Sequence, residues 1–396
     1  MIFSKTPHNL YRSVIGDQLT DTSDLDALTF VIDNYTLISY QSEDDIKEYF
    51  GHAWDLWVHG NNSKLLITFL QEVCSEGKKD YVDHLDKVVS FCKKYNVPGT
   101  KIVIFAANNQ SKENMLDYLV NQIPGVSISG LDFSEYNTVR HFAERNHSQL
   151  DIEPTEERKK FVFFSRHYKS WRHYLVGRLY LEDLLKECNF SFYNIDPYKA
   201  DESGQPTTWP DDWLIKQLKI IDAPLGEDLI ESGFYGSLPF RLPGNGNIYD
   251  INADESTNTA YANSHISVTI ETLFDYGESD FHTTEKTFKP IVYKKPFIMF
   301  SSHLFLKNLR KMGYATFHPY IDETYDTIED PKLRADAVIA EMQRISNLSE
   351  EEFDQLMASC QERVEWNFNR LNRRYDNFYY GINIDPYIEW TMYKQR

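Results

Sequence analysis

The sequence lacks the features that mark secreted, zinc-binding and membrane-spanning proteins. Its 396 residues include only four cysteines, scattered and without a CxxC pair, so neither a disulfide framework nor a zinc module is expected. No stretch approaches the ~18 consecutive apolar residues of a membrane-spanning helix. The opening run, MIFSKTPHNLY, is too polar and too short for a signal peptide. We therefore expect a cytoplasmic protein with reduced thiols and no membrane partner.

Positive charge is scarce as well. Lysine and arginine total 41 against 60 aspartates and glutamates, which gives a net charge of −19. Such a surface repels a phosphate backbone, so general nucleic-acid affinity is not expected, although a local basic groove is compatible with this balance. Aromatic residues are abundant, with 26 Tyr, 25 Phe and 7 Trp. They suit sugar faces and stacked bases, but most aromatic side chains build cores, so composition leaves the ligand open.

The length of the chain predicts two domains. A polar, charged run at His147–Lys160 is the predicted linker. We assign residues 1–155 to a first α/β domain and residues 156–369 to a second. The first contains no GxGxxG, so a dinucleotide site has no sequence support there. Its predicted strands are Leu28–Ile32, Leu37–Tyr40, Lys101–Ala106 and Val126–Ile128, and its predicted helices are Ser63–Val73 and Lys79–Lys94.

The second domain centres on residues 263–317, which alternate strand-like and helix-like pieces. Apolar, β-branched runs predict strands, a threonine before a helical run predicts an N-cap, and Gly313 predicts a helix end. The pattern is βαβαβ, the repeating unit of a doubly wound sheet. Its pieces are the strand Ile266–Ile270, a helix from Thr283 or Thr284 to about Tyr293, the strand Pro296–Ser301, the helix Leu304–Met312 and the strand Ala315–Phe317.

The rest of the second domain is less regular. The run from 197 to 262 is rich in proline and is predicted to be a long functional loop or lid, with one helix at Trp213–Ile221. Ser349 and Glu352 form a capping box. The other predicted elements are the strand Phe161–Phe164 and the helices Ala335–Ile345 and Ser349–Leu371.

The chemistry is predicted at the start of the central helix, where Glu285 and Lys286 fall in the first turn. There, free backbone N–H groups and the positive end of the helix dipole favour an anion, and Lys286 adds a full positive charge. Glu285 can accept two hydrogen bonds from a vicinal diol such as a ribose. The pair predicts a nucleotide-diphosphate site at the carboxyl edge of a parallel sheet. A capped surface helix with an exposed Glu and Lys is the alternative.

The wider stretch resembles the donor-site segment of GT-B glycosyltransferases. A Thr-Glu-Lys-Thr-aromatic-Lys-Pro run at Thr284–Pro290 precedes Pro296-Phe297, and Gly313–Phe317 and an Asp-Glu-x-Tyr-Asp loop at Asp322–Asp326 follow. The run looks most like the Glu-Lys motif of the fucosyltransferase-type families and of the related glycosyltransferases that bacteriophages encode. The resemblance covers roughly residues 160–370, well over half the chain, and is weak before that range.

The resemblance implies an enzyme of two Rossmann-like domains that face a cleft, with residues 370–396 crossing back to the first domain. Such an enzyme moves a sugar from a UDP- or GDP-sugar to an acceptor hydroxyl and requires no metal or other cofactor. Asp24-Leu25-Asp26 follows no buried strand, so a metal-binding DxD signature has no convincing instance. The implied acceptor is a glycan or, for a phage enzyme in the host cytoplasm, a hydroxymethylated DNA base such as 5-hydroxymethylcytosine. A non-catalytic nucleotide- or sugar-binding module is the alternative.

The resemblance also implies roles for single residues. Arg166 and Lys286 are expected to stabilise charge on the departing diphosphate. An inverting enzyme needs a base for the acceptor hydroxyl, for which Asp33 and Asp55 are candidates, whereas a retaining enzyme needs neither. Glu271 ends the first central strand, at the sheet edge where doubly wound folds bind ligands, and could hold a sugar hydroxyl. Further donor contacts are expected from Arg172, Tyr261, Asn263 (or Ser264 beside it), Thr283, Thr284 and Glu285.

Overall fold

The structure is a computed structural model, and the chain divides into two compact units that are described here one at a time. One unit comprises Met1–Phe133 with Asn377–Asn383, and the other Ser134–Asp376 with Ile384–Arg396. The predicted boundary at residue 155 and the predicted return of residues 370–396 stay predictions. The described residues are 2–3, 29–33, 64–69, 85–86, 88–90, 92–106, 115, 118–119, 121–130, 153–200, 206–242, 255–275 and 281–379.

The first unit is built on a five-stranded sheet in which every pair of neighbours is parallel. The predicted strands at 28–32, 101–106 and 126–128 are confirmed, and the described residues between 85 and 94 are helical as predicted. The predicted strand at 37–40 lies outside the described residues. The strands are β1 (Ile2–Phe3), β2 (Thr29–Asp33), β3 (Lys64–Phe69), β4 (Ile102–Ala106) and β5 (Ser127–Gly130), in that order across the sheet.

The helix predicted at Ser63–Val73 is wrong, because β3 occupies this segment between β2 and β4. A parallel strand inside a sheet is covered on both faces, so its sequence reads as a continuous apolar run rather than an alternating one. The run KLLITF has this character, and its apolar spacing also fits a helix. Periodicity alone cannot separate the two for so short a run.

The second unit holds a five-stranded sheet in the order β10-β9-β6-β7-β8. The strands β10, β9, β6 and β7 are parallel, and β8 pairs antiparallel with β7. The chain enters at β6 in the middle of the sheet, continues to β7 on one side, and returns to β9 on the other. The strands are β6 (Lys159–His167), β7 (Cys188–Ala200), β8 (Pro206–Thr208), β9 (Ser264–Ile270) and β10 (Phe297–Phe300). With parallel sheets in both units, the predicted α/β fold class is confirmed.

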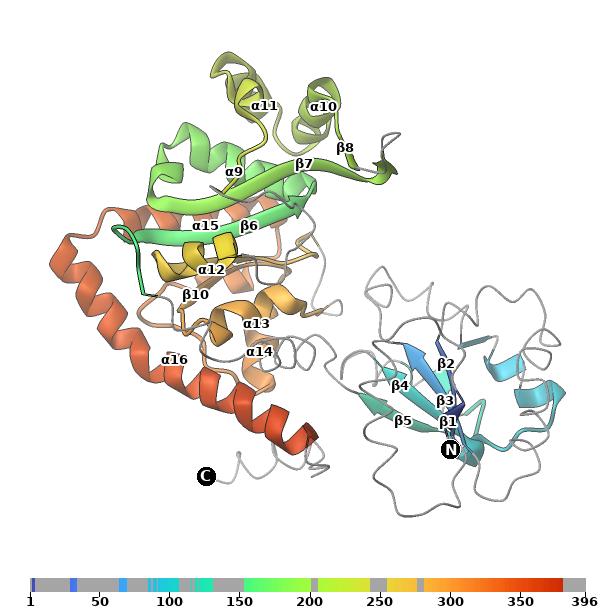
Figure 1. Ribbon diagram of the computed structural model, residues 1–396. Coiled ribbons are helices and arrows are strands. Elements are labelled where there is room, and N and C mark those ends of the chain that lie inside the picture. Colours follow the sequence, from blue (N-terminus) through green and yellow to red (C-terminus); the bar gives the residue numbers. More distant parts are fainter. Residues whose placement is uncertain are drawn as a thin grey trace. The chain divides into compact units, whose positions relative to one another are not determined.

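Helices cover both faces of this second sheet. The β6-to-β7 and β9-to-β10 connections run in opposite directions across the sheet, so right-handed crossovers place their helices on opposite faces. Helix α9 (Ser170–Leu181) and α15 (Pro331–Ser346) pack together on one face, while α12 (Glu255–Ala262) and α13 (Glu285–Val292) pack on β9 from the other (Figure 1). The remaining helices are α10 (Asp211–Ile221), α11 (Ala223–Glu231), α14 (Phe305–Lys311) and α16 (Glu350–Tyr379).

The central pattern is largely confirmed. Both predicted strands and both predicted helices of residues 263–313 are present, Thr284 is the N-cap of α13, and Gly313 takes a φ of +86° just after α14. The capping box is present too: Ser349 N–H donates to the Glu352 carboxylate at 2.9 Å, and Glu352 N–H donates to the Ser349 hydroxyl at 3.3 Å.

The third strand predicted at Ala315–Phe317 is wrong, since the described sheet ends at β10. The segment is held by side chains instead of by a neighbouring strand. The Asn367 amide of α16 accepts from Ala315 N–H at 2.7 Å and donates to Ala315 C=O at 2.9 Å. The Glu323 carboxylate accepts from Phe317 N–H. An amide side chain carries one acceptor and one donor group, so Asn367 supplies what a paired strand would supply.

The predicted loop at 197–262 is also wrong for the described part of that range. Helix α10 confirms the helix predicted at Trp213–Ile221, but the range also contains β8, α11 and α12, and it begins with the end of β7. Strand β7 was missed, although Phe190 and Phe192 alternate with polar residues at the spacing of a strand. Helix α11 was missed because its Asp222 N-cap and Pro224 were read as loop residues, whereas the Asp222 carboxylate accepts from Leu225 N–H at 3.0 Å.

The outer edge of β10 is closed by a side chain. Residues along β10 alternate between facing β9 and facing outward. The backbone N–H groups of Ser267 in β9 and of Glu271 just after it donate to the carbonyls of Pro296 and Phe300. Met299 N–H faces outward and donates to the Tyr325 hydroxyl at 3.1 Å. The ring of Tyr325 is 2% exposed, so this contact lies inside the unit.

Candidate functional site

The candidate site lies at the carboxyl edge of the second sheet, where β6 and β9 are neighbours. The chain leaves β6 toward one side of the sheet and β9 toward the other, so a crevice opens between their ends. In open α/β sheets, ligands bind at such a topological switch point. The sheet of the first unit runs in sequence order through its described strands and has no such point there. The switch-point rule therefore directs attention to the second unit.

Lys286 and Glu285 lie at the start of α13, on one side of this edge. The Thr284 side chain caps the helix by accepting from Lys286 N–H at 3.3 Å. The Lys286 ammonium donates to Glu285 Oε1 at 2.8 Å and to Thr284 Oγ1 at 3.3 Å. Both side chains are less than a third exposed, at 28% for Lys286 and 29% for Glu285. The two residues thus form a partly covered ion pair at a helix start.

Charge keeps Glu285 ionised. Burial alone would raise the pKa of its carboxyl group, but the positive charges of Lys286 and Lys289 and a hydrogen bond from Lys286 outweigh it and lower the pKa to about 2. At neutral pH the site therefore presents one cation and one carboxylate side by side. The two groups neutralise each other while no ligand separates them.

Glu271 follows β9 and is 2% exposed, and its carboxylate is fully occupied. Oε1 accepts from Thr284 N–H at 3.2 Å and from the Thr287 hydroxyl. Oε2 accepts from the Thr284 hydroxyl at 2.7 Å and from Thr272 N–H at 3.1 Å. A carboxylate offers about four lone-pair sites, and all four are used within the chain. Glu271 thus fastens the start of α13 to the end of β9, and its predicted contact with a sugar hydroxyl stays a prediction.

Arg172 holds the two strand ends together. Its side chain is 5% exposed and donates to His167 C=O at 3.1 Å and to Glu271 C=O at 3.3 Å, which are the residues that end β6 and follow β9. Arg172 was predicted to contact the donor directly. The structure uses at least two of its donors to bridge the switch point.

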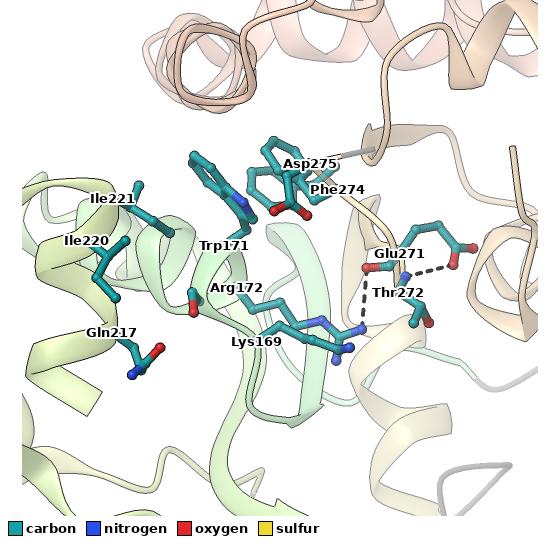
Figure 2. Close-up of a pocket in the computed structure, with 12 residues that line it drawn as sticks. Lys169, Trp171, Arg172, Gln217, Ile220, Ile221, Glu271, Thr272, Phe274 and Asp275 are labelled. Atoms are coloured by element: carbon teal, nitrogen blue, oxygen red, sulfur yellow. Dashed lines mark hydrogen bonds between the residues drawn. The ribbon is translucent and has the colours of Figure 1, made fainter. Parts of the chain in front are cut away.

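A cavity of about 530 Å³ opens on the α9 side of this bridge. It lies between the start of α9, the second half of α10 and the loop after β9 (Figure 2). This volume falls within the range of roughly 300–1,000 Å³ typical of small-molecule sites. Glu271 belongs to both sides of the edge, since its carbonyl holds Arg172 and its carboxylate holds Thr284. The cavity is lined by Lys169, Ser170, Trp171, Arg172, Gln217, Ile220, Ile221, Glu271, Thr272, Phe274, Asp275 and Phe300.

Two predicted donor contacts lie elsewhere. Asn263 precedes β9, at the amino edge opposite the candidate site, and its amide bonds Thr155 N–H at 2.9 Å and the Thr155 hydroxyl at 3.1 Å. Tyr261 is 4% exposed and stacks on Tyr293 with ring centroids 4.1 Å apart, which leaves no ring surface for a base. Asn263 thus ties the segment before β6 to the start of β9, and Tyr261 belongs to the packing between α12 and α13. Their predicted contacts with the donor stay predictions.

Of the remaining predicted site residues, some lie within the described part of the chain and others do not. Arg166 is the penultimate residue of β6, so it lies at the carboxyl edge, and its side chain is outside the description. Asp33 is the last residue of β2 and pairs in register with Thr68 of β3. Asp55 lies outside the described residues. Thr283 is 3% exposed beside the N-cap of α13, and its role in donor binding stays a prediction.

Apart from Arg172 and Glu271, the residues that line the cavity are not indicated by the sequence. Trp171 is the second residue of α9, and Gln217 lies about halfway along α10, where nothing in the sequence distinguishes them from other helix residues. Only the fold brings α9, α10 and the loop after β9 together.

The comparisons with known proteins are sparse. No family model matches the sequence, and no curated protein does either. Among solved structures, the chain is similar to a UDP-forming α,α-trehalose-phosphate synthase of Burkholderia xenovorans, with 10% identity, 91% of this chain and 74% of that chain covered, and a TM-score of 0.42. A second similar structure, a trehalose-6-phosphate protein of E. coli bound with UDP-2-fluoro glucose, has 9% identity and a TM-score of 0.43. The match covers 89% of this chain and 73% of that chain. Likenesses at this level carry no argument about activity.

The described residues contain neither a membrane-spanning helix nor a metal cluster. None of their helices is long and apolar enough to cross a membrane. They include no group of three or more His, Cys, Asp or Glu side chains placed to hold a metal ion. The expectation of a metal-independent reaction stays a prediction.

Proposed function

We propose that the chain is a glycosyltransferase of the GT-B type, which moves a sugar from a nucleotide-diphosphate sugar to an acceptor hydroxyl. The observation that carries the proposal is the carboxyl edge of the second sheet. A cavity and a helix start bearing Lys286 and Glu285 flank one topological switch point there. A nucleotide sugar needs both features, a cavity for its ring systems and an anion site for its diphosphate.

Lys286 acts on the diphosphate in this proposal. Negative charge grows on the departing nucleotide as the bond to the sugar breaks, and the Lys286 ammonium and the α13 dipole stabilise it. The ammonium exchanges its present partner, Glu285, for a phosphate oxygen. Glu285 is then available to accept hydrogen bonds from the ribose hydroxyls. Arg166, at the end of β6, adds a second cation to the same edge.

The acceptor is expected on the first unit, with Asp33 at the carboxyl end of β2 as a candidate base for its hydroxyl. A glycan and a hydroxymethylated DNA base are the two acceptor classes. They are separated by offering oligosaccharides and DNA containing 5-hydroxymethylcytosine with the same donor. Turnover is expected to persist in EDTA, and its loss on chelation would contradict the metal-independent scheme.

The deciding experiment combines binding with turnover. In a thermal-shift panel of nucleotides and nucleotide sugars, only ligands of the true donor class should raise the Tm, because a ligand that binds the folded state stabilises it by mass action. Lys286→Ala should then lower kcat/KM for that donor by ~10²–10³-fold while the fold persists. Lys186→Ala is the matched control, because Lys186 is 61% exposed at the amino edge of the sheet. Normal turnover in Lys286→Ala would remove this residue from the mechanism, and binding without turnover would indicate a non-catalytic module.

A further inference from the structure

Several polar groups of the cavity beside α9 have no hydrogen-bond partner within the described part of the chain. Lys169, Gln217, Thr272 and Asp275 line it, and their side chains form no hydrogen bond or ion pair there. The charge of Asp275 still has a role in the fold, because burial lowers the pKa of Arg334 and the negative charges of Asp326 and Asp275 act against this. Arg172 and Glu271, which also line it, are bonded to strand ends and to α13. The lining therefore contains two kinds of polar group: Arg172 and Glu271, which are bonded within the protein, and the four side chains that form no hydrogen bond.

The walls between these polar groups are apolar. Ile220 and Ile221 lie on the α10 side, Phe274 on the β9 side, and Trp171 between these elements (Figure 2). Trp171 and Phe274 have ring centroids 5.1 Å apart, and Phe274 stacks on Phe300 at 4.0 Å, so the aromatic floor is fixed from below. Apolar walls with polar groups at the rim suit a flat ring that carries its hydrogen-bonding groups on its edge.

The two charged side chains restrict which ring fits. Asp275 can only accept hydrogen bonds when ionised, and Lys169 can only donate. The guanine edge offers the adjacent N1–H and N2–H donors to a carboxylate and the acceptors O6 and N7 to a lysine. Uracil has a single N–H between two carbonyl oxygens. Its edge would therefore place a carbonyl oxygen, which is an acceptor, beside an oxygen of the Asp275 carboxylate, and the two would repel each other. Adenine presents an acceptor at N1, where guanine presents a donor.

We propose that this cavity binds a guanine ring, with Asp275 accepting from its N1–H and N2–H groups, so that the donor is a GDP-sugar. The proposal rests on the proposed glycosyltransferase function and names its nucleotide. The base occupies the α9 side of the switch point, and the ribose and diphosphate extend across the strand ends toward Glu285 and Lys286. Glu271 connects the two parts, because it is bonded to Arg172 at the cavity and to Thr284 at the start of α13.

Direct binding of nucleoside diphosphates to the full chain tests the proposal. In isothermal titration, GDP should bind about tenfold more tightly than IDP, which lacks the 2-amino group. This factor is the contribution of one hydrogen bond to a charged acceptor. ADP and UDP should bind more weakly than IDP. Binding of UDP as tight as that of GDP would overturn the assignment, as would the absence of binding by every nucleotide.

A substitution at the rim supplies a specificity test. In Asp275→Asn the amide still accepts one N–H but now donates where the second oxygen accepted. The affinity for GDP should fall by at least about tenfold. The affinity for xanthosine diphosphate, which has a carbonyl in place of the 2-amino group, should rise. Asp228→Asn, at an exposed position of α11, is the matched control and should bind like the parent. Asp275 is exposed, so Asp275→Asn should still fold, with at most a small fall in the unliganded Tm because its charge favours the charged form of the buried Arg334. An unchanged GDP affinity would refute the proposal.

The outcomes separate this inference from the proposed function. Turnover of a UDP-sugar would support the glycosyltransferase and overturn the guanine site. GDP binding that depends on Asp275, without transfer from any GDP-sugar to oligosaccharide or DNA acceptors, would support the guanine site and refute the enzyme.

Discussion

Replacing Glu271 by glutamine should loosen the start of α13 without changing the size of the side chain. The carboxylate has two oxygens, and each accepts from one backbone N–H and one threonine hydroxyl. In either orientation of the new amide, one oxygen becomes an NH₂ group that faces a backbone N–H donor. The hydroxyl at that position can rotate and accept, but the backbone N–H cannot.

The magnitude follows from this count. A buried donor left without a partner costs ~1–3 kcal/mol, and the apposed NH₂ group adds a second donor in the same position. Glu271→Gln should therefore destabilise the junction between β9 and α13 by about 2–4 kcal/mol. Because the chain has two units, a single unfolding midpoint would mix their stabilities, so a local measurement is needed.

Native-state hydrogen exchange of peptides that cover Thr283–Val292 provides that measurement. The opening free energy of these peptides should fall by the stated amount, while peptides of α15 keep theirs. Glu365→Gln is the control, because Glu365 is 43% exposed and its ion pair with Lys294 spans 3.7 Å, which is worth at most ~1 kcal/mol. If the exchange of α13 in Glu271→Gln matches that of the control, the carboxylate does not hold this helix and the account of the site is wrong.

Two further substitutions test other parts of the second unit. Burial lowers the pKa of His173 from 6.5 to about 3, so the unfolded state takes up this proton first as the pH falls below 6.5. His173→Phe should therefore flatten the loss of stability of α9 between pH 6.5 and about 3, measured as the opening free energy of α9 peptides by native-state hydrogen exchange. An unchanged slope would contradict the assignment. Asn367→Ala should cost about 1–3 kcal/mol by leaving the Ala315 backbone unpaired, whereas Ser359→Ala on the exposed face of the same helix should be nearly neutral.

Sequence reasoning succeeded where local signals agree. At residues 264–313, apolar strands, a threonine cap and a terminal glycine all point to the same elements, and each forms within a few residues of its prediction. It failed for β3, whose continuous apolar run fits either a helix or a covered strand. Strand β7 shows that an available alternating signal can also be overlooked.

The site was harder to predict than the fold, because side-chain partners come from distant parts of the chain. Asn263 is occupied by Thr155, which lies 108 residues earlier, and no local pattern reports that contact. Glu271 lies at the sheet edge as predicted, but no local pattern indicates that Thr284 and Thr287 of the next helix donate to its carboxylate. Trp171, Gln217 and Asp275 meet only once α9, α10 and the β9 loop are packed.

The Tyr325 hydroxyl at the rim of β10 has a consequence for solubility. Exposed strand borders recruit strands from other molecules, which is a common route to aggregation. At Met299 the outward-facing amide is already committed to an internal phenol, so another chain that approached β10 would find no donor at its centre. A tyrosine far along the sequence thus protects this border of the sheet from self-association.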